Sequence, residues 1–378
     1  MSKKKKKLKW KQILLIILIP VVSFCVGLLI GKVSKPVLGE IPPKDFYMGL
    51  LGFYVFFVLF SYVQIVVHEA GHLIFGLLTG YKFSSFRIGS LMWVKADGKL
   101  KLKRYSLTGT GGQCLMAPPD LINGKVPYIL YNLGGCIANI TVSVILLVLV
   151  LPSWKLTYAN CMVLLWSVIG LYFAVINGVP MKIQGMPNDG HNAMELGKHP
   201  DAMRAFWLQM KINEQIALGK RLKELPEEWF ELPDQEGMQN SMVVTIAVFH
   251  CSRLMDQGKY AEAYELMRRL LSEKSGMVGI HRRFLTAECI CCEIIGDNRK
   301  EQVEEFLTEE EMKFLKSMKK SPSAFRTQYL YAKYVEQDEM KAEKAMIAFE
   351  KVSATYPYPN ELESDREVLA YAEKRFGE

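Results

Sequence analysis

A His-Glu-x-x-His motif lies inside an apolar run of this 378-residue chain, at His68, Glu69 and His72. Two histidines four residues apart on an α-helix share one face, so both imidazoles can bind one metal ion. Bound zinc lowers the pKa of its water toward about 7, and a neighbouring carboxylate can take that proton and pass it to a leaving amine. The motif therefore predicts a Zn²⁺ site with Glu69 as general base and acid, which is the chemistry of peptide hydrolysis.

The surroundings of the motif favour a metal site over a chance match. The chain contains only 6 His, so a random match is expected at a rate on the order of one percent. The flanking segments 56–60 and 73–78 are strongly apolar, and a charge within hydrocarbon costs at least about 2.5 kcal/mol. The alternative is that the two histidines only hydrogen-bond neighbouring carbonyl groups.

The composition of the chain changes near residue 200. Residues 1–200 carry a net charge of +14 and residues 201–378 a net charge of −6. This division indicates a basic membrane half followed by an acidic, soluble half. The 8 Cys have neither the spacing of a zinc ribbon nor that of a secreted disulfide framework, which favours a reducing, cytosolic setting for the second half.

Four apolar segments are long enough to cross a membrane, at 13–30, 47–78, 128–151 and 160–179. The first lacks the small-residue cleavage site of a signal peptide. Lys and Arg concentrate before the first segment and in the 81–126 loop, so the positive-inside rule places both, and everything after the fourth span, in the cytosol. We expect a multi-pass protein of a bacterial cell membrane with both termini cytosolic.

This topology predicts where a third metal ligand lies. The C-terminal ends of the second and fourth spans open on the same side of the membrane, and Asp189 is the only carboxylate in the stretch 177–190. The Pro and Gly residues around it break the helix and can turn it toward the metal. His191 is the alternative ligand, but two histidines and a carboxylate leave the open position that hydrolysis needs.

These residues resemble the site-2 protease family of intramembrane zinc metalloproteases. The resemblance covers roughly 47–195 and rests on His68-Glu69-x-x-His72, then Asn177-x-x-Pro, then Asp189-Gly. It implies that Asp189 is the third zinc ligand. It also implies a transmembrane or membrane-associated protein substrate, cut near the cytosolic face as in regulated intramembrane proteolysis.

A further segment, 134–139, is similar to the family's Gly-Pro-x-x-Asn element. By that resemblance Asn139 positions the substrate or the tetrahedral intermediate, and Asn177 positions substrate as well. The alternative for both asparagines is ordinary hydrogen bonding between helices.

Two departures from the family pattern leave a rival function open. Cys136 stands where the family element has proline, and the interval from Asn177 to Asp189 is longer than usual, with Asn188 in place of leucine. The long interval favours a catalytically inactive pseudoprotease that acts as a membrane scaffold, whereas the intact histidine motif favours an enzyme. A transporter is a third alternative, but four spans without an internal repeat give little basis for alternating access.

The loop between the second and third spans predicts a β-hairpin. Residues 93–103 alternate in polarity around Asp97-Gly98, a strong hairpin signal. Its lysines are typical of a solvated face or one lying against lipid headgroups. A sharper hypothesis is that an edge strand here pairs with an extended substrate.

The second half of the chain predicts helices. Segment 203–211 is amphipathic and either rests on the membrane surface or packs against the next helix. Segment 257–264 resembles a tetratricopeptide helix pair, although no clean 34-residue period is present. Such helical arrays bind peptides or other domains, and the alternative is a cap that stabilises the membrane core.

The expected fold is mainly α: about four transmembrane helices with a small β-hairpin insert, and a cytosolic helical-repeat domain. The expected partners are the membrane-protein substrate, the lipid bilayer and a protein or peptide that binds the helical domain, with no nucleic acid. No Walker or Rossmann glycine loop is present, which argues against an ATP-driven enzyme. The expected segments are a basic N-terminus with the first span, a metalloprotease core, an amphipathic linker and the repeat domain, at 1–35, 46–200, 201–239 and 240–378.

Overall fold

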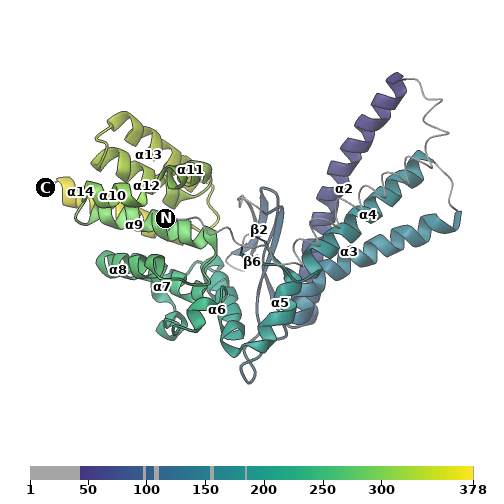
Figure 1. The fold of residues 1–378 in the computed structure, drawn as a ribbon, viewed down its shortest axis with the longest axis horizontal. Coiled ribbons are helices and arrows are strands. Elements are labelled where there is room, and N and C mark those ends of the chain that lie inside the picture. Colours follow the sequence, from purple (N-terminus) through teal and green to yellow (C-terminus); the bar gives the residue numbers. More distant parts are fainter. Residues whose placement is uncertain (1–42, 97–98, 106–109, 154–156, 184, 378) are drawn as a thin grey trace. The chain divides into compact units, whose positions relative to one another are not determined.

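The computed structural model describes residues 43–96, 99–105, 110–153, 157–183 and 185–377, and it is mainly helical with a small antiparallel sheet (Figure 1). The expected N-terminal segment 1–35, with its span at 13–30, lies outside the described residues. The chain divides into two compact units, residues 1–59 and 60–378. All the side chains of the candidate site lie in the second unit.

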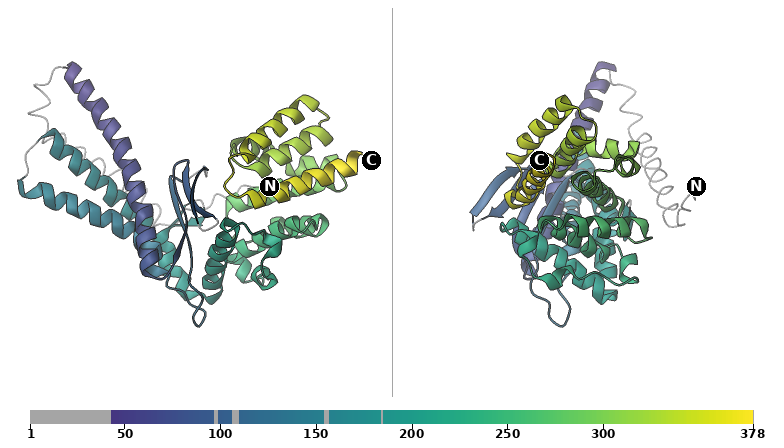
Figure 2. Two further views of the ribbon diagram at one scale, coloured as in Figure 1. Left: turned by 180° about the vertical axis from the view of Figure 1, so that it is seen from behind. Right: turned by 90° about the vertical axis from the view of Figure 1, so that its left-hand side faces the viewer.

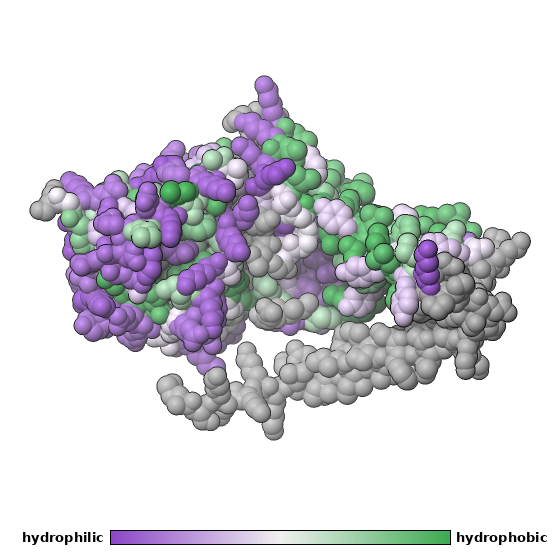
Figure 3. Space-filling model, turned by 90° about the horizontal axis from the view of Figure 1, so that it is seen from above, coloured by the Kyte–Doolittle hydropathy of each residue, from purple (hydrophilic) through white to green (hydrophobic). Residues whose placement is uncertain are grey.

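Three described helices are long and apolar enough to cross a membrane: α2 (Pro43–Leu78), α3 (Ile129–Val150) and α4 (Tyr158–Gly178). Their bounds agree with the predicted spans at 47–78, 128–151 and 160–179, and their length and composition suit such spans. Many of their large apolar side chains are exposed, and Figure 3 shows hydrophobic residues gathered along these helices. An extensive apolar surface of this kind suits contact with lipid.

Glycines bring α2 and α3 into close contact. A Cβ added to Gly71 would lie 2.2 Å from the carbonyl oxygen of Gly134, and one added to Gly134 would lie 2.6 Å from that of Gly71. Small residues allow such close approach of helix backbones in membranes. Gly71 belongs to the turn of α2 that carries His68 and His72. Its contact with Gly134 therefore fixes this turn against α3.

The sheet has four antiparallel strands in the order β3-β2-β1-β4. They are β1 (Lys82–Ile88), β2 (Leu91–Ala96), β3 (Lys99–Arg104) and β4 (Gly112–Ala117). Pairing of β2 with β3, down to Ala96 opposite Lys99, confirms the predicted hairpin. Its turn residues, Asp97 and Gly98, lie outside the described residues. The expected insert was too small, because β1 and β4 extend the hairpin into a full sheet.

A short hairpin and a short helix follow α4. Strands β5 (Lys182–Ile183) and β6 (Met186–Pro187) pair in an antiparallel manner, and α5 (Asp189–Glu195) begins directly after them. Helix α6 (Pro200–Ala217) then buries an apolar face in a core shared with β4 and α3. The helix also contacts the next one (Val244–Asp256), which agrees with packing against the next helix, one of the two alternatives for segment 203–211.

Eight further helices complete the described chain, and neighbours such as α12 and α13 lie side by side (Figure 2). Four cysteines lie in their buried core, and the seven described cysteines of the chain are free thiols. The tetratricopeptide resemblance of this region stays a prediction. The bounds are α7 (Val244–Asp256), α8 (Tyr260–Ser272), α9 (Gly279–Ile295), α10 (Lys300–Phe306), α11 (Glu309–Ser317), α12 (Pro322–Tyr334), α13 (Glu339–Ser353) and α14 (Pro359–Gly377).

Candidate metal centre

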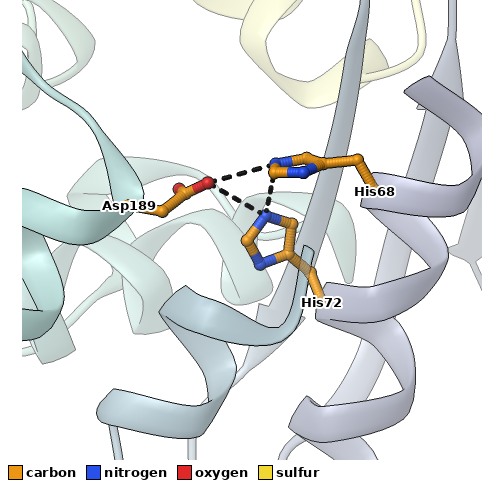
Figure 4. A group of neighbouring side chains, drawn as sticks. All are labelled: His68, His72 and Asp189. Atoms are coloured by element: carbon orange, nitrogen blue, oxygen red, sulfur yellow. Dashed lines mark hydrogen bonds and ion pairs between the residues drawn. The ribbon is translucent and has the colours of Figure 1, made fainter. Parts of the chain in front are cut away.

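Side chains from two separate elements converge on one point (Figure 4). His68 and His72 project from α2, and Asp189 reaches them from the first residue of α5. The Nε2 atoms of the two histidines lie 3.1 Å apart. The Oδ2 atom of Asp189 lies 3.1 Å from Nε2 of His68 and 3.4 Å from Nε2 of His72.

This triangle of donor atoms fits a tetrahedral zinc ion. Zinc bonds of about 2.05 Å at tetrahedral angles hold neighbouring ligand atoms about 3.3 Å apart. The two imidazole nitrogens and the carboxylate oxygen are also donors that zinc accepts. In the described part of the chain, the group that could hold a metal consists of His68, His72 and Asp189 and does not include His191.

The other nitrogen of each histidine ring is already occupied. Nδ1 of His72 lies 2.7 Å from the carbonyl oxygen of Tyr131, which can only accept, so Nδ1 carries the proton. Nδ1 of His68 lies 2.8 Å from Oδ1 of Asn139. In a neutral imidazole the proton on Nδ1 leaves the lone pair on Nε2, so both rings direct a lone pair at the same point as the carboxylate. Only a cation or additional protons can satisfy that arrangement.

Gln64 fixes the orientation of Asn139. The Nδ2 group of Asn139 donates to the backbone oxygen of Gln64 at 3.0 Å and to its side-chain oxygen at 2.7 Å. Oδ1 of Asn139 must therefore face His68. Both amides are fully buried, and partners of this kind orient metal-binding histidines. Sequence reasoning missed Gln64, although a polar residue one helical turn before His68 in an apolar run was an available signal.

Asn188 positions Asp189. Its Oδ1 accepts from the backbone N–H groups of His191 and Met181, each at 3.0 Å, and its Nδ2 donates to the carbonyl groups of Ile176 and Val179, each at 2.7 Å. Asn188 is thus the N-cap of α5 and also ties the end of β6 back to α4. The residues that lengthen the interval from Asn177 form the β5–β6 hairpin, so the extra length does not displace Asp189.

The Asp189 carboxyl lies outside the membrane-spanning helices. Burial alone would raise its pKa, but when His68 and His72 also carry a proton on Nε2 and no metal is bound, their hydrogen bonds to the carboxylate more than offset this, and the pKa is lowered below its ordinary value. The carboxylate is therefore ionised at neutral pH, the form in which it binds metals.

A cavity of about 650 Å³ adjoins the three ligand atoms. Glu69 lines it beside the histidines, and Asn177 lines it from the end of α4. Asn177 also donates from Nδ2 to the carbonyl of Phe173 at 3.0 Å. The remaining walls include residues 110–115, which lead into and form part of β4, and the α6 residues Gln209 and Asn213. The cavity thus combines candidate ligands and a candidate base with many uncharged amide groups.

Comparison with protein families identifies the chain over most of its length. The model of peptidase family M50 matches residues 56–352, a range that includes the histidine motif, the sheet, Asp189 and most of the helical domain. Searches of curated proteins and of solved structures returned no match. The match agrees with the resemblance carried by the motifs, and the chain belongs to peptidase family M50, the site-2 protease family.

Proposed function

We propose that this protein is an intramembrane zinc metalloprotease. The observation that carries the proposal is the convergence of two Nε2 atoms and a carboxylate oxygen at the spacing of ligands around a tetrahedral ion. The family match supports metallopeptidase activity in general. His68, His72 and Asp189 are the residues that would hold the zinc ion.

The proposed mechanism assigns the proton transfers to Glu69. Bound zinc supplies Lewis-acid chemistry, which makes water a nucleophile near neutral pH. Glu69 lies next to His68 in sequence and on the wall of the same cavity, where it takes the proton from the attacking water and returns it to the leaving amine. For Asn139 we propose that it orients His68, because its side-chain amide already hydrogen-bonds His68 and Gln64. Asn177 remains our candidate for a substrate contact.

The proposed substrate is an extended peptide in or next to a transmembrane segment. Hydrolysis requires an extended backbone at the scissile bond, and strand addition to a free edge provides one. The sheet has two edge strands, β3 and β4, and β4 is the one that contributes residues to the cavity. We therefore assign the substrate-pairing role expected for the hairpin to β4.

We also propose that the cavity opens toward the cytosol. The helical domain, on the same side of the membrane, would bind a regulatory protein or peptide.

The inactive alternative gains no support from the site. Its motivation was the long interval before Asp189, and that interval is taken up by the β5–β6 hairpin while the carboxylate still reaches both histidines. The motif residues His68, Glu69 and His72 are all in place.

The first test is the zinc content of detergent-purified protein. We expect about one zinc per chain in the wild type, loss of zinc in Asp189→Ala, and retention in the matched control His191→Ala. Glu69→Gln should retain zinc and lose peptide cleavage by a factor of at least about 10². Full cleavage by the Glu69→Gln protein would exclude the mechanism, and a wild type without zinc would restore the scaffold alternative.

A further inference from the structure

Arg87 is a buried cation close to the catalytic cavity to which neither the motif nor the family match gives a role. It lies in β1 and is 1% exposed. Within the described residues, all the hydrogen bonds that its guanidinium donates go to backbone carbonyls and one hydroxyl. A buried charge with no carboxylate partner is costly, so such residues are retained only where several acceptors satisfy them.

The acceptors of Arg87 belong to two chain segments that must stay together. Nη1 donates to the carbonyl oxygen of Gly89 at 2.8 Å, in the turn between β1 and β2. Nη2 donates to the hydroxyl of Thr110 and, at 3.2 Å, to the carbonyl oxygen of Gly112. The N–H group of Gly89 also donates to Gly111 at 2.8 Å. The planar fork of a guanidinium suits this bracing of several oxygens at fixed angles, which a single ammonium cannot reproduce.

The braced segment, Thr110–Gly112, forms a wall of the catalytic cavity. A Cβ added to Gly112 would lie 2.6 Å from both Cγ and Oε1 of Glu69, and a Cβ added to Gly111 would lie 2.8 Å from Cδ1 of Ile65. The backbone of this segment therefore packs directly against the Glu69 side chain. Any outward movement of the segment would release the carboxylate from its present orientation.

We propose that Arg87 is a positioning residue for Glu69: it holds Thr110–Gly112 against the carboxylate and so limits Glu69 to the orientation used in proton transfer. The proposal rests on the proposed peptidase function. It concerns the base and the wall of the cavity, and it leaves the metal ligands unaffected. Arg87 is not a catalytic residue, because it does not line the cavity, whereas Thr110–Gly112 does.

The test compares Arg87→Lys with the wild type in three measurements. Zinc per chain should be unchanged, kcat for peptide cleavage should fall about 10- to 100-fold with KM changed less than about threefold, and amide hydrogen exchange in Thr110–Ala117 should become about tenfold faster. The matched control is Arg326→Lys, a buried arginine paired with Glu288 and Asp365 in the helical domain, which should leave exchange in Thr110–Ala117 unchanged. A second variant, Thr110→Val, removes one acceptor while leaving Arg87 in place, and should lower kcat about two- to fivefold.

Several results would overturn this role. Wild-type kcat in Arg87→Lys would show that the brace is not needed, and loss of zinc would show that Arg87 supports the metal site or the fold instead. If Arg87→Lys does not fold, wild-type kcat and exchange in Thr110→Val would count against the proposal in the same way. If the wild type binds zinc but cleaves no peptide, the proposed function fails, and exchange alone then decides whether Arg87 holds the segment.

Discussion

At the residue scale, each candidate metal-binding side chain is held by a partner within the protein. His68 depends on Asn139, which depends on Gln64. Asp189 depends on its neighbour Asn188. Such outer partners fix the tautomer and direction of a ligand, and their loss weakens metal binding without removing a ligand.

Asn139→Ala should therefore lower zinc affinity about 10- to 100-fold. The change removes the acceptor that keeps the His68 proton on Nδ1 and leaves the buried Gln64 side-chain oxygen without its donor. The measurement is zinc retention against a graded series of chelator concentrations. Thr141→Ala, on an exposed position two residues further along α3, is the control and should behave as the wild type. Unchanged zinc affinity in Asn139→Ala would leave substrate contact as its role.

The candidate site residues that could be predicted from the sequence are those recognisable from the spacing of nearby residues. His68 and His72 share one helical face with Glu69 beside them in the motif, and the single carboxylate in a Pro- and Gly-rich stretch indicated Asp189. Arg87 and Asn188 were missed for different reasons. The role of Arg87 depends on backbone groups of a segment far along the chain, of which one sequence contains no record, whereas the cap that Asn188 forms on α5 is a local signal that was overlooked. Asn188 was even interpreted as a departure that weakened the case for Asp189, whereas it caps α5.

At the element scale, the position of α5 on the end of α4 decides where Asp189, the third candidate ligand, lies. A Cβ added to Gly190 would lie only 2.0 Å from the carbonyl oxygen of Gly178. The two helices therefore meet backbone to backbone next to Asp189. The spans and the hairpin were predictable from apolar length and alternation, but this contact and strands β1 and β4 were not, because they join segments that are far apart in sequence.

Gly190→Ala should displace α5 and, with it, Asp189. Overpacking of this kind costs about 1–3 kcal/mol, and a ligand displaced by about 1 Å is expected to lower activity about 10²-fold. Zinc content and peptide cleavage are the measurements. Gly279→Ala at the start of α9, where a Cβ would meet nothing within 4 Å, serves as control. Full zinc content and cleavage in Gly190→Ala would mean that α5 can shift without moving the ligand.

At the scale of the whole molecule, the helical domain contains acidic groups that are partly or fully withdrawn from solvent and make its stability depend on pH. Glu361 accepts a hydrogen bond from the hydroxyl of Tyr356 at 2.7 Å. Burial raises its pKa from 4.5 to about 7, and the nearby Asp365 and Asp256 add to the effect, while the Tyr356 hydrogen bond opposes it. A folded-state pKa above the unfolded value means that ionisation opposes folding.

The sign of the pH dependence follows from this shift. Below about pH 4.5 Glu361 is protonated in both states, and between 4.5 and about 7 only the unfolded chain loses the proton, so Glu361 lowers stability as the pH rises. Glu361→Gln should thus raise the melting temperature of the helical domain by a few degrees at pH 8 and by nothing at pH 4. Thermal unfolding of the full chain at both pH values checks this, with the exposed Glu343→Gln as control. An equal effect at both pH values would assign the change to packing instead.

The cavity beside the candidate ligands also affects how water, the second reactant of the proposed hydrolysis, reaches the site. Its volume of about 650 Å³ holds on the order of twenty water molecules at about 30 Å³ each, and the amide groups of Asn132, Asn177, Gln209 and Asn213 on its walls can hydrogen-bond them. Hydrolysis consumes one water per peptide bond, yet the site is built on helices whose surfaces are apolar. A local store of water removes the need for delivery through hydrocarbon. For the proposed peptidase activity, we expect the best substrates to leave part of the cavity unfilled beside Glu69.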